Sequence, residues 1–152
     1  MNYREYRKQM QEEFDKLPIF WAITSQQLRE ALEARGYSYE DRDKVCIVSR
    51  DGAMCMKEDL QVVKDFLNKP DRLSELMENY DFAVSAFEYE MDNHEYAINW
   101  QGDWDVVNCF VRCEYQEDYD YEDYLKEAGK EEWIKAYREA KKRHYKKAEE
   151  WF

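Results

Sequence analysis

The sequence has 152 residues, of which 44% are hydrophobic, 16% aromatic and 38% charged. This length favours a single folded domain, and the aromatic content, with only four glycines and two prolines, excludes a disordered chain. The formal net charge of −12 disfavours direct binding to nucleic acid, because affinity for phosphate needs a basic surface. No apolar run is long enough for a signal peptide or a membrane helix, so we expect a cytoplasmic protein without membrane contact.

In chain order, the first 79 residues predict four helices and three strands. Apolar residues at helical spacing predict helices over residues 1–16, 24–36, 57–69 and 71–79. Short apolar runs predict strands over residues 19–23, 44–49 and 53–56. Asp51-Gly52 is typical of a tight hairpin turn between the last two strands, and we expect the strand 19–23 to be central. Pro70 and Asp71 are expected to end one helix and to cap the next.

The second half of the chain begins with Asp81–Trp100, in which a buried helix is expected to lead directly into a strand over residues 96–100. Further helices are predicted over 104–113, which Asp103 would cap, over 118–128 and over 130–152. The fold class is therefore α+β, with a small, mostly antiparallel sheet of three or four strands among six or seven helices. We expect one domain, with an α+β core over 1–113 followed by an acidic, tyrosine-rich segment and a long helix over 114–152.

Asp92-Asn93-His94-Glu95, at the predicted junction of helix and strand, is the first candidate site. His94 with Glu90 and Glu95 could serve a small metal-dependent or acid/base enzyme as a general base or a metal ligand. The structural alternative is that Asn93 ends the helix in a left-handed turn and that His94 satisfies backbone groups. We favour the structural alternative, because the only other histidine, His144, lies far along the chain. None of the usual two-histidine metal spacings is therefore present. We therefore expect no enzymatic activity and no cofactor.

The four cysteines are the second candidate. Cys46 and Cys55 are expected to be neighbours on the hairpin, and Cys109 and Cys113 to lie one helical turn apart, so that together they could hold zinc. The spacing does not match the usual zinc knuckles, and each cysteine stands where the apolar pattern calls for a small hydrophobic residue. We therefore favour core packing of free thiols in a reducing compartment.

Negative charge is densest between Asp103 and Glu132, where tyrosines alternate with carboxylates. Such a segment could imitate a nucleic-acid backbone and occupy a basic groove on a protein partner, although acidic runs are more often solvated faces. The residues predicted to contact the partner are Glu117, Asp118, Tyr119, Asp120, Tyr121, Glu122, Asp123 and Tyr124.

The last predicted helix carries an aromatic stripe and a base-rich outer side. The stripe consists of Trp133, Tyr137, His144, Tyr145, Trp151 and Phe152. It could pack on the core of its own chain, or it could form a homodimer through residues 130–152. We favour packing within the chain.

Two segments carry a resemblance to other proteins: Phe20-Trp21-Ala22-Ile23-Thr24-Ser25-Gln26-Gln27-Leu28 and Phe87-Glu88-Tyr89-Glu90-Met91-Asp92-Asn93-His94-Glu95-Tyr96. On these segments the chain resembles a group of small uncharacterised proteins of phages and bacterial mobile elements, over roughly residues 14–100. The hairpin turn of that group is richer in glycine than the turn at residues 49–53 here. The resemblance implies a phage-type accessory protein that interferes with a host defence complex, such as a CRISPR effector, or with another nucleic-acid-handling complex.

Overall fold

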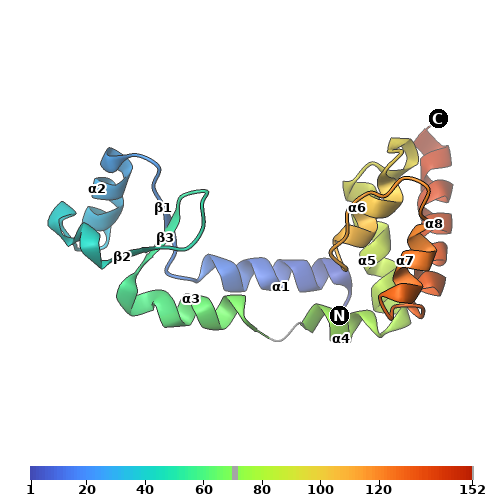
Figure 1. Ribbon diagram of the computed structural model, residues 1–152, viewed down its shortest axis with the longest axis horizontal. Coiled ribbons are helices and arrows are strands. Elements are labelled where there is room, and N and C mark those ends of the chain that lie inside the picture. Colours follow the sequence, from blue (N-terminus) through green and yellow to red (C-terminus); the bar gives the residue numbers. More distant parts are fainter. Residues whose placement is uncertain (70–71, 152) are drawn as a thin grey trace. The chain divides into compact units, whose positions relative to one another are not determined.

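The computed structural model describes residues 1–69 and 72–151. The helix end predicted at Pro70, the cap predicted at Asp71 and the stripe residue Phe152 therefore lie outside the described residues. The chain forms two compact units, which we call the sheet unit, Met10–Pro70, and the helical unit, Met1–Gln9 with Asp71–Phe152. The first helix, α1 (Tyr3–Asp15), contributes to both (Figure 1). The expectation of one domain, with an α+β core over 1–113 and a further segment over 114–152, stays a prediction.

The sheet unit contains a three-stranded antiparallel sheet and short helices, which confirms the α+β class. The strands are β1 (Phe20–Trp21), β2 (Val45–Ile47) and β3 (Ala53–Met56), in the order β1-β3-β2. The helices are α2 (Ser25–Ala34), the 3₁₀ turns η1 (Tyr39–Lys44) and η2 (Lys57–Asp59), and α3 (Leu60–Leu67). The expectation that the strand at 19–23 is central was wrong: β2 and β3 pair as a hairpin, and β1 occupies the free edge of β3.

The hairpin register differs from the predicted one by two residues. Cys46 lies opposite Cys55, and residues 48–52 connect the strands, with Gly52 at φ 97°. Side chains alternate with a period of two, so a shift of two residues keeps the same side chains on each face of the hairpin. Helix α2 packs Leu32 against Phe20 and Met56 to form the small core of this unit.

The helical unit is built around α5 (Tyr80–Asn93), which lies beside α8 (Trp133–Ala148) (Figure 1). The other elements are α4 (Arg72–Met77), the 3₁₀ turn η3 (Tyr96–Ile98), α6 (Gly102–Asn108), α7 (Tyr121–Glu127) and the terminal 3₁₀ turn η4 (Glu149–Trp151). Phe87 is fully buried, and its ring contacts those of Phe110, Trp133 and Tyr137. No helix in the described residues is long and apolar enough to cross a membrane.

The predicted strand at 96–100 was wrong, because this segment forms the 3₁₀ turn η3. Glu95 adopts a left-handed conformation with φ 51°, which turns the chain as it leaves α5. Tyr96 is buried, whereas Ile98 and Trp100 are 74% and 77% exposed. A strand would place these three alternate residues on one face, so the apolar alternation in the sequence does not reflect one buried surface.

Asp103 does not cap α6, contrary to the prediction from the sequence, because Gln101 occupies the N-cap position. Its carboxylate instead accepts hydrogen bonds from the hydroxyls of Tyr96, at 2.5 Å, and Tyr137, at 2.6 Å. Burial, reinforced by this carboxylate, raises the pKa of both tyrosines well above the ordinary value. The two phenols thus stay neutral and tie η3 and α8 to α6.

These raised pKa values predict that the protein loses stability in alkaline solution. Below about pH 10 the tyrosines are protonated in both folded and unfolded chains, and the stabilisation is complete. Above about pH 10 only the unfolded chain releases these protons, so the free energy of unfolding falls by up to ~1.4 kcal/mol per pH unit for each tyrosine. Urea unfolding across this range should give a shallower pH dependence for Tyr137→Phe. Equal slopes for the variant and the wild type would contradict this assignment.

Truncation of Phe87 to alanine should lower the free energy of unfolding by about 3–5 kcal/mol, because it leaves a cavity among three aromatic rings. Chemical denaturation followed by tryptophan fluorescence measures the change. Ile98→Ala is the control in the same unit, since its 74% exposed side chain should cost no more than about 0.5 kcal/mol. Similar losses for the two variants would show that α5 is not the centre of this core.

Candidate functional site

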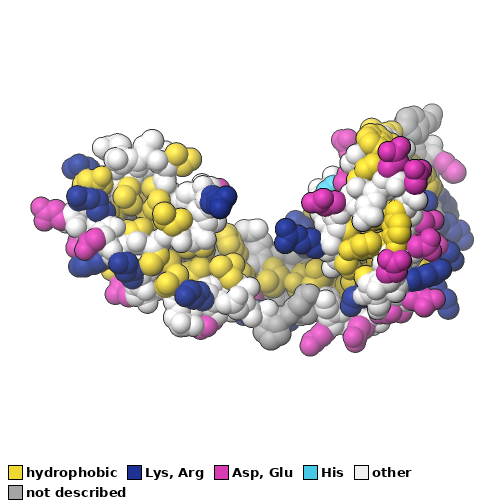
Figure 2. All heavy atoms as spheres, viewed as in Figure 1, with side chains coloured by type: hydrophobic (Ala, Val, Ile, Leu, Met, Phe, Trp, Pro, Cys, Tyr) yellow, Lys and Arg dark blue, Asp and Glu magenta, His cyan; other side chains and the backbone are white. Residues whose placement is uncertain are grey.

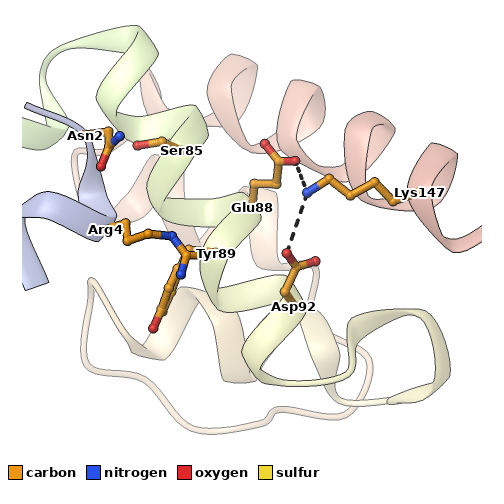
Figure 3. A pocket seen from close by; sticks show the side chains of 7 residues that line it. All are labelled: Asn2, Arg4, Ser85, Glu88, Tyr89, Asp92 and Lys147. Atoms are coloured by element: carbon orange, nitrogen blue, oxygen red, sulfur yellow. Dashed lines mark ion pairs between the residues drawn. The ribbon is translucent and has the colours of Figure 1, made fainter.

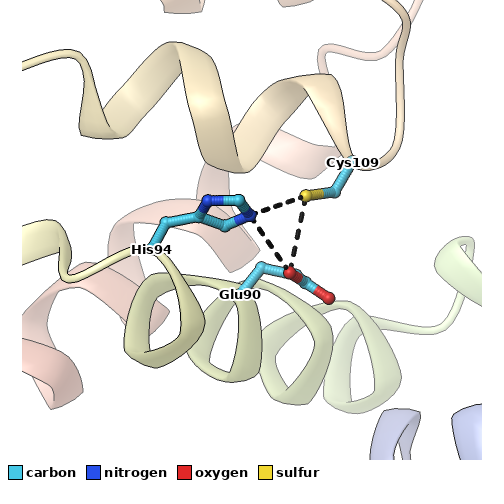
Figure 4. A group of neighbouring side chains, drawn as sticks. All are labelled: Glu90, His94 and Cys109. Carbon is cyan, nitrogen blue, oxygen red and sulfur yellow. Dashed lines mark hydrogen bonds and ion pairs between the residues drawn. The ribbon is translucent and has the colours of Figure 1, made fainter.

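Glu90, His94 and Cys109 meet where the end of α5 contacts the end of α6. Glu90 and His94 are one turn apart on one side of α5, and Cys109 caps the C-terminus of α6. His94 Nε2 lies 3.5 Å from Glu90 Oε2, and Cys109 Sγ lies 3.4 Å from His94 Nε2 and 3.5 Å from Glu90 Oε2. Figure 4 shows the three side chains converging on one point.

The carboxylate of Glu90 is 2% exposed and is held on both oxygens. Oε1 accepts hydrogen bonds from the Tyr3 hydroxyl at 2.7 Å and from the Arg7 guanidinium at 3.0 Å. Oε2 accepts a bond from the Asn93 amide at 3.3 Å. Burial, followed by hydrogen bonding and Coulombic interaction with this carboxylate, raises the pKa of the Tyr3 phenol. These bonds fix the orientation in which Oε2 faces His94 and Cys109.

The Cys109 thiol is neutral at ordinary pH. Burial, followed by the Glu90 carboxylate, raises its pKa to about 12. A cysteine nucleophile needs the opposite shift, so the cluster is not arranged like the site of a cysteine enzyme. The His94 side chain is 33% exposed and forms the opening of the cluster to solvent.

Of the three residues that the sequence analysis proposes here, the structure brings Glu90 and His94 together and adds Cys109 in place of Glu95, while a catalytic role stays a prediction. Glu95 is exposed and adopts a left-handed backbone conformation after the helix, outside the cluster. The structural alternative for this segment was also wrong in detail, because Asn93 is still helical and Glu95 makes the left-handed turn. The four-residue spacing of Glu90 and His94 was visible in the sequence. The approach of Cys109 depends on how α6 packs against α5.

All four cysteines are free. Cys46 and Cys55 form a cross-strand pair in the sheet unit, as expected. Cys109 and Cys113 belong to the helical unit. The predicted helix over 104–113 is shorter than expected, because α6 ends at Asn108, so Cys113 lies beyond the end of the helix. Its thiol lies 3.8 Å from the Trp104 carbonyl. Cys55 is buried and the other three are partly buried. Core packing, which the sequence favours, and the alternative of zinc held by all four cysteines both stay predictions.

In the acidic segment over residues 117–124, the tyrosines are partly buried, whereas most of the carboxylates are exposed. The Tyr121 ring packs against Tyr137 at 4.8 Å, and the Tyr124 ring packs against Trp104 at 5.7 Å, while its hydroxyl donates to the Arg112 carbonyl at 2.9 Å. The Tyr119 ring also lies against Trp104, and is partly buried. These tyrosine rings thus hold the acidic segment against the rest of the helical unit. Among residues 117–124, the exposed carboxylates are Glu117, Asp118, Asp120 and Asp123.

Two acidic residues of this segment have structural roles. Asp120 caps α7 by accepting a hydrogen bond from the Glu122 amide at 2.7 Å. Glu122 forms a two-point ion pair with Arg138 of α8, at 2.8 and 2.6 Å, and Arg138 lowers its pKa. The acidic segment thus forms an ion pair with the basic helix α8 through Glu122. We call the remaining exposed carboxylates, Glu117, Asp118 and Asp123, the acidic surface. Figure 2 shows acidic and basic side chains interspersed over the visible face of this unit.

The aromatic stripe of α8 packs within its own chain. Trp133, Tyr137 and His144 are buried, and the His144 imidazole contacts Asp92 at 2.9 Å. Tyr145 and Trp151, by contrast, are 44% and 62% exposed. A homodimer through residues 130–152 remains a prediction, and three of the six stripe residues are buried and not available to a second copy.

A shallow pocket lies beside α5, on the side facing α8 and the N-terminus (Figure 3). Lys147 reaches across it to form ion pairs with Glu88 and, at 3.6 Å, with Asp92. Arg4 lies over the Tyr89 ring, 5.0 Å from its centroid. The charged groups of this pocket thus have partners within the protein.

Comparison with known proteins gives a family but no activity. No curated protein and no solved structure matches the chain. A model for a protein family of unknown function, DUF7659, matches residues 2–135. These residues include Glu90, His94 and Cys109 together with the whole acidic surface. The chain therefore belongs to this family of unknown function.

Proposed function

We propose that the protein is a non-enzymatic acidic binding protein, which uses the acidic surface to occupy a basic groove on a protein partner in the cytoplasm. The observation that carries the proposal is that Glu117, Asp118 and Asp123 are exposed, whereas the tyrosines between them are partly buried. The partner class is a host defence or nucleic-acid-handling protein, and the role is that of a phage-type inhibitor such as an anti-CRISPR protein.

Anchoring of the tyrosines supports this proposal energetically. A flexible acidic tail loses conformational entropy when it binds, which weakens its affinity. Here the Tyr121 and Tyr124 rings pack on the core, and the Tyr124 hydroxyl is bonded to the backbone. The carboxylates therefore project from a segment whose position is already fixed, and part of the entropy cost is met on folding.

The charge distribution supports a protein partner. The net charge of −12 repels nucleic acid, whereas it attracts a basic groove built to bind nucleic acid. Such attraction accelerates association and weakens as salt screens the charges, over a Debye length of about 8–10 Å at physiological ionic strength. Strong salt dependence is therefore expected of the complex.

Removal and reversal of charge on the acidic surface should weaken partner binding. The test variant combines Glu117→Lys, Asp118→Asn and Asp123→Lys. It spares the cap at Asp120 and the ion pair of Glu122, and asparagine suits the left-handed backbone at residue 118, where φ is 63°. Affinity capture from a bacterial lysate at low and high salt, with mass spectrometry, identifies the partner, and equilibrium binding to that partner then measures the dissociation constant. We expect it to rise at least about tenfold, since close charge pairs contribute more than about 1.5 kcal/mol.

The matched control makes the same change in net charge elsewhere, by combining Glu33→Lys, Glu40→Lys and Asp43→Asn on exposed positions of the sheet unit. It should bind the partner nearly as tightly as the wild type. Unchanged affinity of the acidic-surface variant, or equal loss in both variants, would contradict a role for this surface.

A further inference from the structure

The Glu90–His94–Cys109 cluster has the atoms and spacing of a metal site. Three different ligand types, a carboxylate oxygen, an imidazole nitrogen and a thiol sulfur, lie 3.4–3.5 Å from one another. Among the described residues, no other group of three histidine, cysteine or acidic side chains is close enough to hold one metal ion. The arrangement is therefore specific to this place in the helical unit.

The distances between these three atoms can be compared with the distances between ligand atoms around a bound zinc ion. Zinc binds sulfur at about 2.3 Å and nitrogen or oxygen at about 2.0–2.2 Å with tetrahedral angles, which places its ligand atoms about 3.3–3.7 Å apart. The two separations that involve Glu90 Oε2 match the values for their ligand pairs, and the Cys109 Sγ–His94 Nε2 separation is about 0.1 Å shorter than the roughly 3.5 Å of a sulfur–nitrogen pair. We propose that Glu90, His94 and Cys109 bind a divalent metal ion of the zinc class, with the fourth position open to solvent.

Ordinary hydrogen bonding explains the cluster less completely. The Cys109 sulfur lies near Glu90 Oε2, near His94 Nε2 and 3.3 Å from the Asp105 carbonyl. A thiol carries one proton and can donate to one acceptor at a time. A metal ion that replaces this proton, which passes to solvent, binds the sulfur, the imidazole and the carboxylate together.

The surroundings of the cluster match the outer shell of a metal site. Ligating carboxylates are usually oriented by further hydrogen bonds, and Tyr3 and Arg7 provide these on Glu90 Oε1. This leaves Oε2 directed at the other two ligands. Three protein ligands with one open position are typical of zinc sites that bind a water molecule, and the partly exposed His94 ring gives solvent access to that position.

The proposal is tested by metal binding to the whole protein. Zinc retained after dialysis should amount to one ion per chain, and Co²⁺ added in its place should give a thiolate-to-metal charge-transfer band. Cys109→Ser should abolish the band. Cys109→Ser and His94→Ala should each weaken zinc binding in a chelator competition by more than the roughly 10–100-fold typical of a lost outer-shell partner. Tyr3→Phe should fall within that range.

Cys113→Ser is the matched control, because this thiol lies four residues away and outside the cluster. It should keep the metal, the band and the affinity of the wild type. Circular dichroism of the metal-free variants confirms that each is folded. The proposal fails if the wild type retains no zinc, if Cys109→Ser and His94→Ala bind zinc as tightly as the wild type, or if Cys113→Ser loses it equally.

Discussion

A charge that is buried in a protein must be paired, because removing it from water is costly unless other groups replace the lost hydration. The Glu90 carboxylate poses this requirement in the middle of the helical unit. Tyr3 and Arg7 satisfy one oxygen, and Asn93 contacts the other, which faces His94 and Cys109. The N-terminus, α5 and the end of α6 are distant in sequence, and this one carboxylate joins them.

A second carboxylate performs a similar task at the other end of α6. Asp103 accepts bonds from Tyr96 and Tyr137, and so joins η3 and α8 to the same helix. Tyr121 packs on Tyr137 and brings α7 onto this group. The position of the acidic surface thus follows from buried tyrosines, while the cluster at Glu90 lies on a separate part of α5 and α6. The two proposals rest on different residues and can stand or fall independently.

Local patterns predicted most helices, because apolar periodicity reports directly on which side of a helix is buried. They failed where a single backbone conformation redirected the chain. A left-handed residue is intrinsically more favourable at Asn93 than at Glu95, yet Glu95 adopts it, and the alternation after it resembled a strand. For the candidate site, helical spacing joined Glu90 to His94. Cys109 could not be added, since its approach depends on tertiary packing of α6.

The central claim is that the buried Glu90 carboxylate orients an open metal site, and anomalous X-ray diffraction at the zinc absorption edge tests it most directly. In crystals grown with zinc, we expect one anomalous peak within about 2.0–2.3 Å of Glu90 Oε2, His94 Nε2 and Cys109 Sγ. The absence of an anomalous peak at these three residues, or peaks only at surface carboxylates, would contradict the claim. Glu90, His94 and Cys109 would then be joined by hydrogen bonds alone.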